Sequence, residues 1–389
     1  MDIINNKNKL EEIMNDENNL EFSSSSESVY PMNGIKIEKC FYTIYELKRK
    51  YDKLQSRIIL DSDFQREDVW GPDRKSELVE SILMGLPLPL FYFNEDKMGR
   101  LIVIDGRQRL TALFEYLDNK FALNKLKILV ELNGKKVRDL SPILQSRIED
   151  YQIQAHVIMP PTPDRIKFDI FDRVNRAGMQ LNKQEIRNAL YQGNATSLLN
   201  NLSKSIEFKQ ATGNAFDKEK RMKDKYILIR FIAFYLYFKG EIIHEGKPYA
   251  YKNDIDELLG KSLEYLNTIN EDELEYINNI VLKALENTYF YLGDNAFRLV
   301  KNGRKSPINM NVFETIMYIM MQIDYKDIFL IEEVKELVAD MLVNNKFLDS
   351  IGNHRDNIGK VNVRFNFANQ IGERISYVKR NSYKSIKEY

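Results

Sequence analysis

The sequence is poor in the residue types that many catalytic and metal-binding sites require. It has one cysteine, Cys40, and three histidines, His156, His244 and His354, among 389 residues. A single cysteine excludes an intrachain disulfide framework and is typical of a protein in a reducing cytosol. So few histidines disfavour a histidine-rich metal site and nucleophilic catalysis of the Ser/His/Asp or Cys/His type. We therefore expect carboxylate, amide and arginine side chains to form any catalytic or binding site.

The sequence also lacks an excess of charge and a long apolar run. Lys+Arg and Asp+Glu both total 57, which argues against a surface coated with nucleic acid, although a local basic patch is compatible with this balance. The most apolar segment, 226–238, is too short to span a bilayer and contains Arg230. The N-terminal segment MDIINNKNKLEEIMNDENN has no apolar core of a signal peptide. We expect a soluble, cytoplasmic protein with no membrane partner.

The pattern of apolar residues divides the chain into three parts. Residues 1–32 form an acidic, polar tail that includes SSSSES and is predicted to be disordered. Residues 33–160 contain strand-like segments separated by helical ones; the strand-like segments are IKIEKCFYTI, RIIL, LFYF, RLIVI and YQIQAHVIMP. Beyond PPTP at 160–163 helical patterns dominate. We predict an α+β protein, with a small mixed-sheet domain at 33–160 followed by a mostly helical domain at 161–389.

A turn from a strand to a helix is the first candidate site. The apolar run 100–104 predicts a buried strand, which ends at Asp105 and Gly106 and leads into a helix. The apolar stripe of this helix consists of Leu110, Leu113, Phe114 and Leu117. The first N–H groups of a helix and the positive end of its dipole attract phosphate. Gly106 has no Cβ, so a ligand can approach the main chain closely.

The side chains of the turn favour the same interpretation. At about 100° per residue, Gln108 points away from the apolar stripe, while Arg107 and Arg109 flank it on opposite sides, an arrangement suited to binding phosphate oxygens. Asp105 would hold Mg²⁺ through water, or clamp one of the arginines. The alternative is that Asp105 is an N-cap and the arginines are solvated. Two basic residues in a first turn oppose the dipole, however, and require an anion or a salt bridge nearby.

Several motifs in order along the chain resemble a known family. They are FQREDVW, KSELVESILMGLPLPLFYF, VIDGRQRLTAL and IFDRVNRAGMQLNKQEIRNALYQG. This set resembles the DGQQR-motif domain of GmrSD-type restriction proteins, which is related to the ParB and sulfiredoxin fold. The resemblance is strongest over residues 60–195. It implies a ParB/sulfiredoxin-like sheet domain, nucleotide phosphates bound at the turn after the central strand, nucleoside triphosphate hydrolysis with Mg²⁺, and defence against phage or modified DNA.

Carried over by position, the resemblance assigns the site residues. The candidate catalytic residues are Asp105, Gln108, Arg109 and Gln65, with Asp105 also the candidate metal ligand. The candidate nucleotide-binding residues are Arg66, Trp70, Gly106, Arg107, Arg109, Thr111, Asn175, Gln184 and Arg187. Arg107 stands where the family usually has glutamine, which adds positive charge and puts in doubt the orientation of an attacking water by that amide.

Two of these groups also have structural interpretations. Arg66 would pair with phosphate or with Asp105, and Trp70 would line the pocket or stack on a base; alternatively, Trp70 anchors its loop in the core. Asn182 and Glu185 fit a capping box. Capping leaves a second set unexplained, namely Asn175, Gln184 and Arg187, which we expect to converge on the nucleotide.

The leading hypothesis is a DNA-directed defence or restriction-type protein that binds and hydrolyses a nucleoside triphosphate. One alternative is a metal-dependent nuclease that uses Asp63, Asp68 and Asp105; another is a non-catalytic nucleotide-switched adaptor or DNA-binding protein. An HNH nuclease domain is not expected, because His354 has no second histidine after it. The basic stretches 218–225, 301–305 and 374–387 suit DNA phosphates or solvated helix faces. Expected partners are therefore a nucleotide, DNA and a separate nuclease or defence-system subunit.

Overall fold

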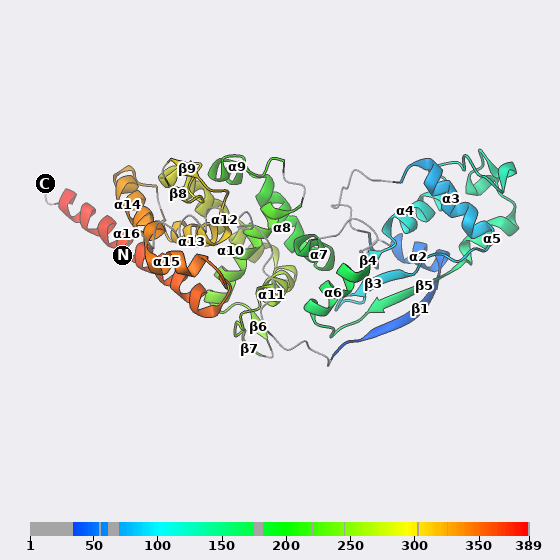
Figure 1. The fold of residues 1–389 in the computed structure, drawn as a ribbon, viewed down its shortest axis with the longest axis horizontal. Coiled ribbons are helices and arrows are strands. Elements are labelled where there is room, and N and C mark those ends of the chain that lie inside the picture. The colour runs from blue at the N-terminus through cyan, green and yellow to red at the C-terminus, as the bar shows by residue number, and fades with distance from the viewer. Residues whose placement is uncertain are drawn as a thin grey trace. The chain divides into compact units, whose positions relative to one another are not determined.

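The protein divides into two compact units, which are described separately. The computed structural model describes residues 34–53, 56–60, 70–174, 182–218, 221–244, 246–301, 303–324 and 326–387 (Figure 1). One unit, the sheet unit, spans Tyr30–Gln192, and the other, the helical unit, contains Gly193–Tyr389. The first holds a mixed sheet and the second is mostly helical, so the predicted α+β class is confirmed.

Five strands in the order β1-β5-β3-β4-β2 form the sheet. Their bounds are β1 (Ile37–Thr43), β2 (Ile58–Ile59), β3 (Phe91–Glu95), β4 (Leu101–Asp105) and β5 (Gln152–Ile158). β1 and β5 pair antiparallel, as do β3 and β4, whereas β3–β5 and β2–β4 are parallel. Every strand-like segment of the sequence contributes a strand, although RIIL supplies only the two residues of β2.

One face of the sheet carries the core of the sheet unit. Alternate residues of the central strands, Phe91 and Phe93 of β3 and Leu101 and Val103 of β4, are buried in one apolar cluster. Four helices contribute to this cluster: α2 (Ile44–Tyr51), α3 (Pro72–Leu83), α4 (Arg107–Leu117) and α5 (Pro142–Glu149). Ile102 and Ile104, which alternate with Leu101 and Val103 along β4, are also buried. β4 is therefore buried on both faces, as its uninterrupted apolar sequence predicts.

The sheet unit ends later than the sequence suggested. We expected the domain boundary at 160/161, but the unit extends to Gln192. It includes α6 (Asp164–Val174) and α7 (Lys183–Leu190), which pack against each other, and α7 also packs beside β4. A helical period shows that a segment has an apolar side but not which core buries it. The predicted boundary therefore lies inside the sheet unit.

The helical unit is built from nine α-helices within the described residues. Their bounds are α8 (Asn194–Lys204), α9 (Ile206–Thr212), α10 (Lys223–Lys239), α11 (Ile255–Thr268), α12 (Glu271–Leu292), α13 (Met310–Met320), α14 (Ile331–Val343), α15 (Asn345–Ile351) and α16 (Ile358–Lys387). Two short hairpins accompany them: β6 (Ile243–His244) with β7 (Lys247–Pro248), and β8 (Val300–Lys301) with β9 (Arg304–Lys305).

A capping box at Asn270 separates α11 from α12. Asn270 accepts a hydrogen bond from the backbone N–H of Glu273 at 2.9 Å, and Glu273 accepts one from the N–H of Asn270 at 3.2 Å. This reciprocal pair satisfies N–H groups at the start of α12 and therefore favours a new helix there. The chain therefore forms two helices, α11 and α12, in this region.

α10, which contains the apolar segment 226–238, is buried along most of its length. It packs against α8, α11 and α13. Over the part of the chain that the structure describes, no helix combines the length and the apolar character needed to cross a membrane.

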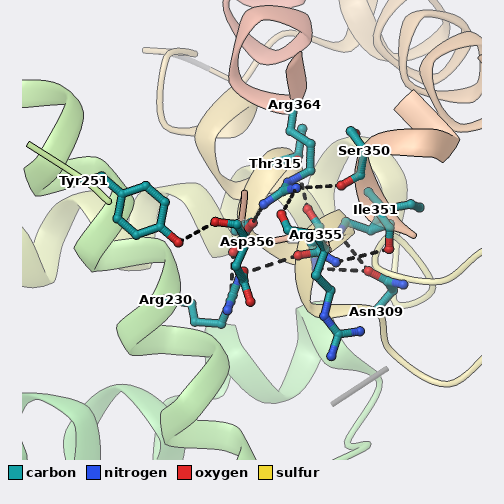
Figure 2. A network of polar contacts seen from close by, with 12 residues as sticks. Arg230, Tyr251, Asn309, Thr315, Ser350, Ile351, Arg355, Asp356 and Arg364 are labelled. Carbon is teal, nitrogen blue, oxygen red and sulfur yellow. Dashed lines mark hydrogen bonds and ion pairs between the residues drawn. The ribbon is translucent and has the colours of Figure 1, made fainter. Parts of the chain in front are cut away.

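A buried ion network connects α10, α13 and α16 with the segment before α16 (Figure 2). Arg230 of α10 contacts Glu314 of α13 at 3.0 Å and Asp356 at 2.6 Å. Arg364 of α16 reaches the other oxygen of Glu314 at 2.7 Å, and the Tyr251 hydroxyl donates to the Asp356 carbonyl at 2.6 Å. Burial disfavours the charge on Arg230, but Asp356 and Glu314 raise the pKa of its guanidinium well above the ordinary value. Two positive and two negative groups therefore compensate each other inside the unit.

Candidate functional site

The turn between β4 and α4 has the predicted form. β4 ends at Asp105, Gly106 occupies the N-cap position with φ 97°, and α4 begins at Arg107. The apolar stripe of α4 faces the core as expected: Leu110, Leu113 and Phe114 are buried and Leu117 packs against them. Because Gly106 is the cap, the structure does not support the alternative in which Asp105 is the N-cap.

Gly106 is required by packing as well as by its backbone conformation. A Cβ at this position would lie 2.2 Å from Cδ1 of Phe91, far inside van der Waals contact. A φ of 97° is also strained for any residue that carries a side chain. The space that the absent Cβ leaves is therefore occupied by the Phe91 ring, and close approach of a ligand is not needed to explain this glycine.

Arg109 is turned into the protein, where its guanidinium makes three hydrogen bonds. It donates to the carbonyl of Pro89, to that of Leu90 at 3.1 Å, and to Oδ2 of Asp105 at 2.7 Å. Its guanidinium carbon lies 4.2 Å from the centre of the Phe91 ring. Burial lowers the pKa of Arg109, while the carboxylate of Asp105 acts in the opposite direction. The structure thus shows Asp105 clamping an arginine, one of the two roles expected for it.

Arg107 and Gln108 have different positions from Arg109 in the first turn of α4. Arg107 is half-buried and Gln108 is exposed, as the helical projection predicted, whereas Arg109 is buried. Thr111, one turn further on, is half-buried. The guanidinium of Arg109 is held by the carbonyls of Pro89 and Leu90 and by Asp105. The part of α4 nearest solvent therefore carries Arg107, Gln108 and no acidic residue in its first turn.

Asp105 keeps one oxygen for further contacts. Its side chain is 38% exposed, and Arg109 contacts only Oδ2. Mg²⁺ in nucleotide sites is commonly held by one or two carboxylates together with the phosphates of the substrate. A single, oriented and partly exposed carboxylate fits that donor set. Elsewhere in the described residues, no group of three or more His, Cys, Asp or Glu side chains has metal-binding geometry.

Trp70 packs as a core anchor. It contacts the apolar cluster of the sheet unit, and the guanidinium carbon of Arg74 lies 4.6 Å from the centre of its ring. These contacts agree with the alternative in which Trp70 anchors its loop in the core. Gln65, Arg66 and Asn175, like the alternative metal ligands Asp63 and Asp68, lie outside the described residues.

The second predicted group is on α7. The capping box is confirmed: Asn182 accepts from the N–H of Glu185 at 2.9 Å and Glu185 accepts from that of Asn182 at 2.7 Å. Gln184 and Arg187 are both fully buried, and Arg187 donates to Oε1 of Gln184 at 3.3 Å. The guanidinium carbon of Arg187 lies 5.3 Å from the ring centre of Phe168.

Asn188 is a residue that the sequence analysis did not select. It is 1% exposed, yet neither its Oδ1 nor its Nδ2 has a hydrogen-bond partner among the residues that the structure describes. Nε2 of Gln184 also has none. The sequence spacing could have indicated it, because Asn188 follows Gln184 by four residues and therefore lies on the same face of α7.

A comparison with protein-family models finds a match that covers most of the sheet unit. Residues 44–192 match a family model described as GmrSD restriction endonuclease, N-terminal domain. The match begins at α2 and ends with the sheet unit, and it includes the β4–α4 turn and α7. It covers less than half of the chain, so it identifies this region as similar to that domain and says nothing of the helical unit. The resemblance stated from the motifs is thereby confirmed for the sheet unit.

Neither a search of curated proteins nor one of solved structures found a match. The ParB/sulfiredoxin kinship of the sheet accordingly stays a prediction.

Proposed function

We propose that this protein binds a nucleoside triphosphate at the β4–α4 turn and hydrolyses it as part of a DNA-directed restriction system. The observation that carries the proposal is the construction of the turn. A left-handed glycine starts α4, an oriented carboxylate precedes it, and the first helical turn presents Arg107 and Gln108 with no acidic side chain. A helix start with this charge pattern favours an anion.

Each residue of the turn has a role in this proposal. The start of α4 and Arg107 contact the phosphates, since both are positive and Arg107 is only half-buried. Gln108, which is exposed, positions the water that attacks the terminal phosphorus, and the bond from that phosphorus to the bridging oxygen breaks to give a diphosphate and inorganic phosphate. Asp105 would hold Mg²⁺, which neutralises phosphate charge when bound. Arg109 acts as a positioning residue, because it touches Asp105 and main-chain carbonyls.

The DNA-directed part of the proposal rests on the family description. The matched domain is named for restriction endonucleases, so its substrate or target is expected to be DNA. We assign cleavage to a separate nuclease subunit, with nucleotide turnover on this chain controlling it.

Phosphate release by the purified protein tests this function. ATP, GTP, CTP and UTP are supplied with Mg²⁺, with and without DNA, and nucleotide binding is measured in parallel. We expect release with at least one nucleotide. Arg107→Ala should weaken nucleotide binding roughly tenfold or more, because it removes a charge-assisted contact to phosphate.

The matched control is Arg138→Ala, which removes the same charge from an arginine of the sheet unit whose side chain is 70% exposed. This variant should bind nucleotide and release phosphate as the wild type does. Binding without release in the wild type would select the adaptor function. If the protein binds none of the four nucleotides, the proposal is overturned.

A further inference from the structure

Buried amide groups on α7 lack the partners that buried polar groups normally have. Asn188 is 1% exposed and Gln184 is fully buried, yet within the described part of the chain three of their four side-chain polar atoms have no hydrogen-bond partner. Most buried polar side-chain atoms in proteins are paired, because leaving water without a replacement contact is unfavourable. These atoms require either ordered water or a ligand.

The two amides do not serve the helix itself. The start of α7 is capped by Asn182 and Glu185, and the Asn188 main-chain carbonyl accepts a hydrogen bond from Nε2 of Gln192 at 2.8 Å. Gln184 is oriented by Arg187, which uses its Oε1. That contact leaves Nε2 of Gln184 as a donor and Asn188 as both a donor and an acceptor.

α7 lies next to the strand that leads into the proposed phosphate-binding turn. α7 packs beside β4, the strand that ends at Asp105. Asn94 of β3 alternates with the core residues Phe91 and Phe93 and pairs with Ile102 of β4. It is 3% exposed, and its Oδ1 also has no partner. Unsatisfied amide atoms therefore occur on two elements that both neighbour β4.

We infer that Gln184 and Asn188 are specificity-determining residues that hydrogen bond to the base of the nucleotide whose phosphates bind at the β4–α4 turn. A carboxamide offers a donor and an acceptor in one plane, and nucleobase edges present the complementary pair. The inference rests on the proposed function, since it concerns the same ligand. It adds that base selection lies on α7 and phosphate binding on α4.

Affinities for the four nucleoside triphosphates and for inorganic tripolyphosphate test the assignment. The wild type should prefer one base, and it should bind tripolyphosphate through the β4–α4 turn alone. Asn188→Leu, which keeps the size and removes both polar atoms, should reduce the preference between bases by roughly five- to a hundredfold. Its affinity for tripolyphosphate should stay as in the wild type.

Gln192→Leu is the matched control, because it removes an amide of the same segment that already has a partner. It should retain the base preference. If Asn188→Leu does not fold, as judged by circular dichroism and thermal unfolding, Asn188→Ala replaces it. An unchanged base preference in the folded variant would overturn the inference and assign these amides to buried water.

Failure of the inference is distinguishable from failure of the proposed function. If the wild type binds tripolyphosphate and all four nucleotides with equal affinity, the phosphate site stands and base selection by α7 is refuted. If it binds neither tripolyphosphate nor any nucleotide, both are refuted.

Discussion

At the scale of single residues, Gly106 meets two separate requirements. Its φ of 97° favours glycine, and the Phe91 ring occupies the place of a Cβ. The same ring lies under the guanidinium of Arg109, which holds Asp105. Phe91, Gly106 and Arg109 therefore form one packed group that sets the direction of the Asp105 carboxylate.

Replacement of Gly106 by alanine is expected to destabilise the protein strongly. The left-handed conformation and the collision with Phe91 together should lower the free energy of unfolding by roughly 2–5 kcal/mol. Urea unfolding followed by the fluorescence of Trp70, the only tryptophan, measures this change in the sheet unit.

Gly85→Ala provides the control for this prediction. Gly85 has a similar φ of 74°, but nothing lies within 4 Å of its Cβ position. Gly85→Ala should lower the free energy of unfolding only through the backbone strain, by about 1–2 kcal/mol. Equal losses in the two variants would show that the Phe91 ring moves away without penalty.

At the scale of elements, Glu80 connects α3 to the segment after α4. Its Oε1 accepts hydrogen bonds from the N–H groups of Ile128 at 2.9 Å and Leu129 at 2.8 Å. Burial raises the pKa of this carboxyl, but the N–H groups of Leu129, Ile128 and Lys127, together with the charge of Lys127, outweigh it, and the pKa is lowered. The carboxylate form is therefore favoured in the folded protein.

The stability of the protein should depend on pH through Glu80. Because its folded pKa is lower than its unfolded one, its contribution is present above the ordinary glutamate pKa of about 4.3 and is lost as the pH falls below it. Glu80→Gln should lower the free energy of unfolding at pH 7 by about 1–3 kcal/mol. The difference from the wild type should shrink between about pH 5 and pH 3.

Glu77→Gln changes an exposed residue of the same helix and should follow the wild type at every pH. A constant difference between Glu80→Gln and the wild type across this range would contradict the assignment.

Elements were more predictable from the sequence than their partners. The strands, α3, α4 and the capping box of α7 follow from local patterns, namely apolar runs, Pro72 at a helix start, and Asn182 with Glu185 three residues later. The assignment of α6 and α7 to the sheet unit did not follow, because it depends on tertiary packing. For the same reason the partners of Arg109, which come from residues 89 and 90, were not foreseeable.

At the scale of the whole molecule, residues far apart in the sequence are connected by buried charges. Arg230, Glu314, Asp356 and Arg364 come from separate parts of the helical unit and are nearly inaccessible to solvent. The sequence showed only that Arg230 interrupts an apolar helix. Its partners lie 84 and 126 residues away, beyond the reach of any local pattern.

Loss of one charge from this network should destabilise the helical unit. Glu314→Gln leaves Arg230 and Arg364 with a single carboxylate, and breaking a buried pair of this kind typically costs about 3–5 kcal/mol. Thermal unfolding followed by far-ultraviolet circular dichroism reports mainly on helices and measures the change. Glu332→Gln, which alters a side chain that is 87% exposed, should change stability by less than about 0.5 kcal/mol. A similar small effect at Glu314 would contradict the role of the network.

The central claim, that phosphates bind at the β4–α4 turn, is tested most directly by the backbone amide of Gly106. The sequence contains one Asp-Gly pair, Asp105–Gly106, so labelling aspartate carbonyls with ¹³C and glycine nitrogens with ¹⁵N selects a single amide resonance. Titration with a nucleoside triphosphate and Mg²⁺ should shift this resonance saturably, and tripolyphosphate should do the same. An unchanged Gly106 resonance at nucleotide concentrations that saturate binding would place the ligand elsewhere and contradict the account.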